Sequence, residues 1–128
     1  MLRTNHNIRL VILSNKETIL CLFGEIQNEE INDKRIIGYR MMYPFTLSLG
    51  ESNDDGTIPI QYTRWCPFTP VQEFKMSGDH IISVTYPDDN ILDNYVAELA
   101  QYGITSEQIF FTQEEVSGDQ SEPDQTAE

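Results

Sequence analysis

One stretch, KMSGDHIISVTYP at residues 75–87, does most to decide the fold of this 128-residue chain. An apolar run ends before the turn sequence SGD at residues 77–79, and alternating apolar residues follow it. The glycine, Gly78, supplies the backbone freedom that a tight turn needs. We therefore expect two strands, at 73–76 and 80–86, joined as a hairpin.

Upstream of this stretch the sequence also has the pattern of strands and turns. Further strands are expected at residues 8–13, 18–26, 35–49 and 58–68. The second of these is apolar on both faces, which predicts a central strand buried on both sides. The segment 50–56, bracketed by glycines, is the strongest turn signal. Five short, bend-prone strands predict a mainly β fold in the form of a small, partly open barrel. Periodicity alone does not choose between SH3-like, OB-like and Sm-like barrels.

After Pro87 the hydrophobic period changes to that of a helix. The segment 88–90, Asp-Asp-Asn, supplies an N-cap and places acids at the positive end of the helix dipole. Gly103 is suited to end the helix. One helical stripe is formed by Ile91, Leu92, Tyr95, Val96, Leu99 and Ala100. We expect a C-terminal helix over about 88–103.

The remainder of the chain completes a prediction of one domain and one tail. Residues 104–112 are expected to hold a short packed turn or strand. Residues 113–128 carry six acids, no aromatic residue and one valine, which is typical of a disordered segment. The predicted domain therefore covers 1–112, and a disordered acidic tail covers 113–128.

The charge of the chain restricts the classes of partner. The net charge is −13, with nine acids and eight bases in residues 1–75 and twelve acids and no base in residues 76–128. A global basic footprint for nucleic acid is therefore absent, and any such binding has to be local. The longest uncharged apolar run, 19–23, is far too short for a membrane span. Polar residues near the N-terminus, from Arg3 to Asn7, predict that there is no signal peptide.

Cofactor, metal and enzyme signatures are missing from the sequence. Cys21 and Cys66 could form one disulfide, but a pair of buried cytosolic thiols is the favoured interpretation. Neither C-x-x-C nor H-x-x-H spacing occurs, and neither phosphate-binding glycine motif is present. Cys66 and His80 have no third orienting group and no oxyanion signature beside them. We expect no metal, no cofactor and no enzymatic activity.

Residues 75–87 resemble the second motif of Sm-like proteins, the family of LSm and Hfq. Gly78 and Asp79 match that motif, as do the apolar pattern after them and Pro87, whereas Ser77 replaces the usual arginine and His80 the usual asparagine. The first two predicted strands look like the start of the first Sm motif, although its Asp-x-x-Met-Asn signature is missing. The late helix makes the chain similar to divergent Sm-like proteins of marine tailed phages, particularly those that infect cyanobacteria. The resemblance covers roughly residues 8–103.

The resemblance implies a small, strongly bent, five-stranded Sm-like (SH3-type) barrel that assembles into a homo-oligomeric ring of about five to seven subunits. In that family the strand after the second motif pairs with a strand of the next subunit, so no edge stays free. The oligomer-interface residues implied in this way are Ile81, Ile82, Val84, Met42 and Trp65. The alternative for Met42 and Trp65 is a place in the core or an anchor at the edge of the barrel.

The resemblance also implies that the ring binds single-stranded RNA between two loops, by base stacking and cationic contacts. The residues at the corresponding positions are Asn32, Lys34 and Arg35 in the first loop and Ser77, Gly78, Asp79 and His80 in the second. His80 could instead be a packed turn residue, and Lys34 and Arg35 could simply offset the acids around them. The acidic tail serves either as a solvating segment or as a competitor of nucleic acid.

Two other functions stay open beside RNA binding. The first is a ring kept for protein–protein assembly, with a phage or host protein as its partner. The second is a monomeric SH3- or OB-like barrel. A cytoplasmic location, the host cytoplasm if a phage encodes the protein, and no contact with a membrane are expected for all three.

Overall fold

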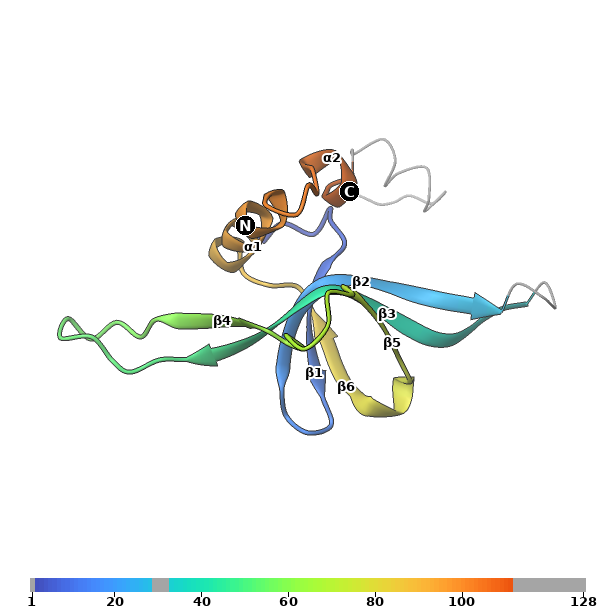
Figure 1. Ribbon diagram of the computed structural model, residues 1–128, viewed down its shortest axis with the longest axis horizontal. Helices are drawn as coiled ribbons and strands as arrows, with labels where there is room; N and C mark the ends of the chain where they lie inside the picture. Colours follow the sequence, from blue (N-terminus) through green and yellow to red (C-terminus); the bar gives the residue numbers. More distant parts are fainter. Residues whose placement is uncertain (1, 29–32, 112–128) are drawn as a thin grey trace. The chain divides into compact units, whose positions relative to one another are not determined.

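The computed structural model describes residues 2–28 and 33–111 (Figure 1). This part of the chain divides into two compact units, which we describe separately. Residues 8–87 form the first, which we call the sheet unit. Residues 2–7 and 88–111 form the second, which we call the terminal unit.

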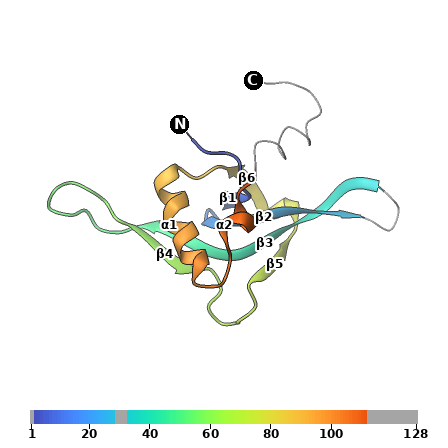
Figure 2. The same cartoon turned by 90° about the horizontal axis from the view of Figure 1, so that it is seen from above.

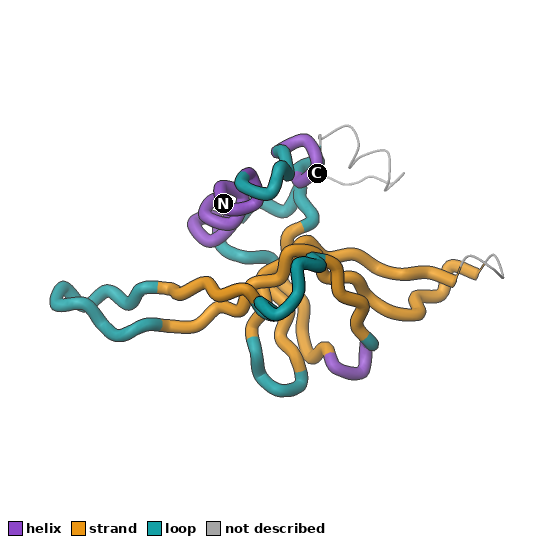
Figure 3. Tube along the Cα trace, viewed as in Figure 1, coloured by secondary structure: helices purple, strands orange, loops and turns teal. Residues whose placement is uncertain are grey.

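The sheet unit is one antiparallel sheet of six strands (Figure 3). Its elements are β1 (Ile8–Leu13), β2 (Thr18–Asn28), β3 (Asp33–Leu49), β4 (Ile60–Arg64), β5 (Glu73–Met76), the 3-10 helix η1 (Gly78–His80) and β6 (Ile81–Thr85). The strand order is β4-β3-β2-β1-β6, with β5 also paired to β3. The predicted mainly β fold is confirmed. The sheet has six strands instead of five and is not closed, since no pairing within the described residues joins β6 to β4 or β5.

Strands β4 and β5 follow one another along the same edge of β3. Residues 45–49 of β3 pair with β4 and residues 39–42 pair with β5, while β2 occupies the other edge. Between β4 and β5 the chain leaves the sheet as a loop of residues 65–72, which projects between the two strands in Figure 2. The predicted strand 58–68 is therefore shorter than expected, because the chain turns away from β3 after Arg64.

The predicted hairpin at 73–86 is wrong. β5 pairs with β3, β6 pairs with β1, and η1 carries the chain from one to the other. The backbone of Gly78 is also not in the left-handed conformation. A Cβ atom at this position would lie 3.2 Å from Cε2 of Tyr39, so close packing, and not backbone freedom, is what favours glycine here.

The core of the sheet unit lies on one face of its central strands. Its fully buried members are Val11, Leu13, Ile19, Cys21 and Met41, and Phe23, Trp65, Met76 and Ile81 pack against them half-buried. The predicted burial of β2 on both faces is confirmed for the four consecutive residues 19–22. Such a continuous apolar run is typical of a strand covered on both sides.

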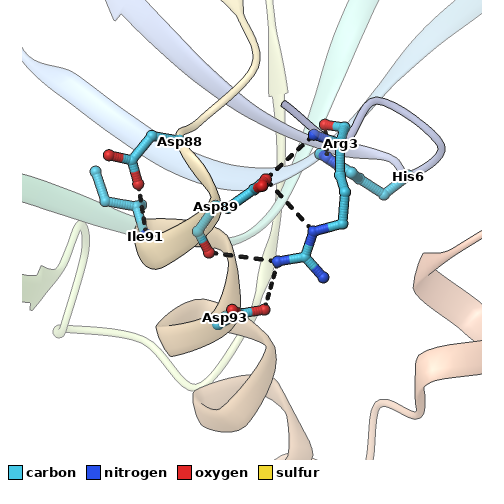
Figure 4. Close-up of polar contacts among 6 residues, drawn as sticks. All are labelled: Arg3, His6, Asp88, Asp89, Ile91 and Asp93. Atoms are coloured by element: carbon cyan, nitrogen blue, oxygen red, sulfur yellow. Dashed lines mark hydrogen bonds and ion pairs between the residues drawn. The ribbon is translucent and has the colours of Figure 1, made fainter. Parts of the chain in front are cut away.

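The terminal unit contains two helices, α1 (Asp89–Ala100) and α2 (Ser106–Ile109). The predicted N-cap is confirmed, because the carboxylate of Asp88 accepts a hydrogen bond from the N–H of Ile91 at 3.0 Å (Figure 4). Gly103, predicted to end the helix, has a φ of 85° just beyond α1. Three residues of the predicted stripe are buried: Leu92, Tyr95 and Leu99.

The N-terminal segment pairs with the end of the described chain. The N–H of Phe111 donates to the carbonyl of Asn5 at 2.8 Å, and the side-chain amide of Asn5 donates to the carbonyl of Phe111 at 3.0 Å. Between these contacts His6 and Phe110 form an isolated bridge, and their rings meet edge to face. This pairing between the two ends of the described chain was not predicted. The acidic tail predicted at 113–128 lies outside the described residues.

Candidate functional site

The turn around η1 is the first part of the predicted site. The hydroxyl of Ser77 accepts a hydrogen bond from the N–H of Asp79 at 3.2 Å, which caps the short helix. The N–H of Ser14 donates to the carbonyl of His80 at 2.8 Å and ties the turn to the loop after β1. Ser77, Gly78, Asp79 and His80 are all exposed. The second predicted loop is thus a fixed, solvent-facing turn.

The first predicted RNA-binding loop is only partly described. Asn32 lies outside the described residues, and Lys34 is placed as a residue of β3. Arg35 is exposed near the start of the same strand. Because Tyr39 is the residue paired with Met76 beside η1, Arg35 lies four residues farther along β3, about 13 Å from that level. The β3 residue that lies against η1 is Tyr39, whose ring is next to Gly78, four positions from Arg35.

An aromatic pair that the sequence did not single out lies beside η1. The rings of Phe23 and Tyr39 stack with centroids 5.3 Å apart and an interplanar angle of 18°. Tyr39 is half-buried and contacts the position of Gly78, as described above. The sequence pattern could not reveal this pair, because the two aromatic residues come together only through the register of β2 and β3, in which Glu25 pairs with Tyr39. The Tyr39 ring of this pair therefore provides a planar surface beside the turn.

Positive charge at this end of the sheet is partly neutralised. The guanidinium of Arg40 forms an ion pair with the carboxylate of Glu73 on the neighbouring strand β5. Lys75, two residues after Glu73 on β5, is exposed. A partly exposed ion pair of this kind contributes little stability and is weakened by salt. Because Arg40 is paired with Glu73, Lys75 is the remaining exposed cation of β5, and one cation is not a basic patch.

The predicted interface residues of β6 fall into two groups. Ile81 is half-buried and packs against the core of its own chain. The side chains of Ile82 and Val84 are 64% and 40% exposed. Val84 pairs with the core residue Val11, so the apolar core face extends as far as the outer edge of β6. β6 contains neither a charged residue nor a proline, although its register against β1 shifts beside Ile82.

Met42 and Trp65, the other predicted interface residues, lie inside the sheet unit. Met42 is half-buried on β3 and pairs with Leu22 on one side and Glu73 on the other. The indole N–H of Trp65 donates to the carboxylate of Glu17 at 3.1 Å, and the ring meets Phe74 edge to face. Trp65 packs half-buried against the core of its own chain, which accords with the alternative of an anchor at the edge of the barrel. Met42 lies outside the core cluster described above.

A polar cluster in the terminal unit was not predicted (Figure 4). Arg3 donates through Nη2 to Asp93 at 2.6 Å, and its backbone N–H donates to the carboxylate of Asp89 at 3.1 Å. The hydrogen bond from the Arg3 backbone lowers the pKa of Asp89 below its ordinary value of 3.8. The buried ring of His6 lies against the carbonyl of Arg3, with Nε2 at 2.9 Å. These contacts hold the N-terminal segment on α1.

The structure provides two free thiols. Cys21 is buried in the core, and desolvation raises the pKa of its thiol far above the ordinary range, only partly opposed by Arg9. Cys66 is half-buried in the 65–72 loop. In the part of the chain that the structure describes, no three His, Cys, Asp or Glu side chains gather as metal ligands.

No protein-family model matches this sequence, and no curated protein matches it. Across residues 2–28 and 33–111, none of the helices has the length and hydropathy that crossing a membrane requires. The functional argument therefore depends on the residues and the geometry described above.

Proposed function

We propose that the protein is a non-enzymatic assembly protein of the Sm-like type, whose copies join edge to edge into a closed ring. In this arrangement β6 of one copy pairs with β5 of the next. The contact is head to tail, and such contacts close into rings when the rotation between copies allows it. The sheet unit would then be a small bent barrel completed by its neighbour.

The observation that carries this proposal is the open sheet with an unpaired outer edge. β6 pairs with β1 on one side, and no strand of the described residues pairs with its other side. Soluble proteins usually protect such edges with charged residues, proline or a β-bulge. β6 has neither charge nor proline, and the register shift beside Ile82 leaves residues 83–85 regularly paired with β1. Val84 extends the core face to this edge, and Ile82 is exposed beside it. Pairing with a second copy would satisfy the free backbone groups and cover both side chains.

The mass of the protein in solution tests this proposal. We expect light scattering after size exclusion to give a multiple of 14.8 kDa. Ile82→Lys should return the protein to the mass of one chain, because it places a charge within the proposed contact. Leu49→Lys is the matched control, since Leu49 is 71% exposed and pairs with Ile60 of β4, outside the part of β3 that pairs with β5. A wild-type protein with the mass of one chain, at concentrations up to hundreds of micromolar, would refute the proposal.

Single-stranded RNA is a second candidate ligand, favoured by the aromatic pair beside η1. Stacking of a base on an aromatic ring is the main sequence-tolerant contact in single-strand recognition. Tyr39 is half-buried next to the exposed turn 77–80, and Lys75 is exposed on β5. The acidic balance of the chain weighs against tight binding.

Fluorescence anisotropy with short U-rich and A-rich RNAs distinguishes the two candidates. RNA binding predicts an affinity that falls as salt is raised and that Tyr39→Leu or Lys75→Ala weakens. Tyr102→Leu is the control for the loss of a tyrosine, because Tyr102 is exposed in the terminal unit. An assembled protein that binds neither RNA at tens of micromolar would leave assembly as its function.

A further inference from the structure

We propose that the loop of residues 65–72 is a docking element that places Phe68 against the end of β6 of the neighbouring copy. This inference rests on the edge-to-edge assembly proposed above and adds to it a second contact, outside the paired strands. It also names the side chain that would contribute most to the affinity between copies.

The exposure of the loop is the first observation. Phe68 is 92% exposed and Val71 is 56% exposed, so two apolar side chains of one short loop face solvent. Phe68 has the highest exposure of the large apolar residues in the described chain. Aromatic side chains with this exposure are typical anchor residues of interfaces, where a few of them dominate the affinity.

Backbone hydrogen bonds hold both ends of the loop, although Phe68 and Val71 are exposed. Its ends are joined to β3, because the N–H of Trp65 donates to the carbonyl of Pro44 at 3.0 Å and the N–H of Tyr43 donates to the carbonyl of Gln72 at 2.7 Å. Tyr43 has a φ of 52°, a conformation that a residue with a side chain rarely adopts. The bend in β3 opposite the loop is therefore maintained by specific contacts at both ends of the loop.

Hydrogen bonds inside the loop fix its tip. Nη2 of Arg64 donates to the carbonyl of Thr69 at 2.8 Å. The hydroxyl of Thr69 accepts from the N–H of Val71 at 3.1 Å. Pro67 and Pro70, on either side of Phe68 and Thr69, further restrict the backbone. A loop ordered before binding loses less conformational entropy on association, and this favours a docking role.

The position of the loop indicates that its binding partner is a second copy of the chain. β5 begins at Glu73, directly after the loop, and every strand pairing of this sheet is antiparallel. Antiparallel pairing of β5 with β6 of a neighbour places the start of β5 beside the end of that β6. The loop then meets the neighbouring copy's residues 84–86, which include the exposed Val84 and the half-buried Tyr86.

The charge of the loop supports the same binding partner. Residues 56–72 contain no aspartate or glutamate, in a chain that has 21 acids. The end of β6 is followed closely by the exposed Asp88. The loop itself is free of acids and has Arg64 at its base, and the next acid along the chain, Glu73, is paired with Arg40. The loop can therefore approach that segment of a second copy with little like-charge repulsion.

Photo-cross-linking of the full-length protein tests the contact directly. We would replace Phe68 by p-benzoylphenylalanine, irradiate a mixture of isotopically light and heavy protein, and map the cross-linked peptides by mass spectrometry. The expected result is a cross-link between light and heavy chains that joins position 68 to residues 84–86. The same probe at Leu49, which is 71% exposed on the β3–β4 hairpin, is the control and should not give this product. Intermolecular products at other residues, or none from the assembled protein, would overturn the inference.

A second measurement separates this inference from the proposed assembly. Phe68→Ala should raise the dissociation constant between copies about tenfold or more in analytical ultracentrifugation, with an unchanged circular dichroism spectrum. An assembled variant with the wild-type constant would overturn the role of Phe68 and leave edge pairing intact. A wild-type protein that is monomeric throughout would overturn both proposals.

Discussion

The turn between β1 and β2 contains a residue whose backbone conformation favours glycine. Lys16 has a φ of 74°, in the left-handed region, and its side chain is exposed. Its N–H donates to the carbonyl of Leu13 at 2.8 Å, and the N–H of Leu13 donates to the carbonyl of Glu17 at 3.0 Å. A turn closed in this way, with its last residue left-handed, is the three-residue hairpin loop in which glycine is preferred. We predict that Lys16→Gly stabilises the protein.

The expected size of the effect follows from two opposing contributions. The left-handed conformation costs a non-glycine residue about 1–2 kcal/mol, and glycine removes that cost. Glycine also gains about 0.5–1 kcal/mol of conformational freedom in the unfolded chain, which opposes the gain. The two contributions leave a net gain of about 0–1.5 kcal/mol, so the free energy of unfolding should rise by roughly 0.7 kcal/mol and the melting temperature by about 2–5 °C.

The neighbouring residue gives a matched control with the opposite sign. The side-chain amide of Asn15 donates to the carboxylate of Glu17 at 2.8 Å, and its oxygen accepts the N–H of Glu17 at 3.0 Å. Asn15 does not have a left-handed backbone, so Asn15→Gly loses both hydrogen bonds without relieving any strain. It should lower the free energy of unfolding by about 1–2 kcal/mol.

Urea unfolding followed by tryptophan fluorescence measures all the variants of this turn, because Trp65 is the single tryptophan and contacts the turn at Glu17. Lys16→Ala, which keeps the strained backbone, should change the free energy of unfolding by less than about 0.5 kcal/mol. Equal effects of Lys16→Gly and Asn15→Gly would refute the reasoning.

Three further predictions concern the core, the helix cap and the N-terminal cluster. Met41→Ala should lower the free energy of unfolding by about 2–5 kcal/mol in urea titrations, because Met41 is fully buried in the core, whereas Ile37→Ala on an exposed position should have little effect. Asp88→Ala should cost about 1 kcal/mol through loss of the cap on α1, measured by thermal unfolding against the exposed control Asn94→Ala. The lowered pKa of Asp89 stabilises the fold above its unfolded value of 3.8, and that contribution is lost as the pH falls through the folded pKa. Asp89→Asn should accordingly reduce stability more at pH 7 than at pH 2, and an equal reduction at both would contradict this assignment.

The local elements of this fold could largely be predicted from the sequence. The first strand and the strand at 73–76 have the predicted bounds, and the helix after Asp88 begins at its predicted cap. These features depend on neighbouring residues, through alternation, turn composition and capping, so a single sequence is enough to detect them. The turn at 77–79 was predicted for the same reason, although the hairpin predicted around it is wrong.

Strand pairing could not be read in the same way. The segments on either side of Gly78 have the pattern of a hairpin, yet each pairs with a distant strand, because β3 and β1 provide longer apolar edges than the short strands provide for one another. The close packing of Gly78 against Tyr39 and the stack of Phe23 on Tyr39 follow from that pairing. A residue can be recognised as apolar from sequence, but its neighbours across a sheet are set by register.

By itself the sequence determined that this chain is mainly β, that a capped helix follows the strands, and that its acids are concentrated after Lys75. The tertiary structure alone decided that the sheet stays open at β6, and that the 65–72 loop leaves β3 to expose Phe68. The physical reason is the range of the interactions. Propensity, capping and charge act between residues close in the chain, whereas an open edge and an exposed loop depend on how strands far apart in the sequence divide the available hydrogen bonds and apolar surface.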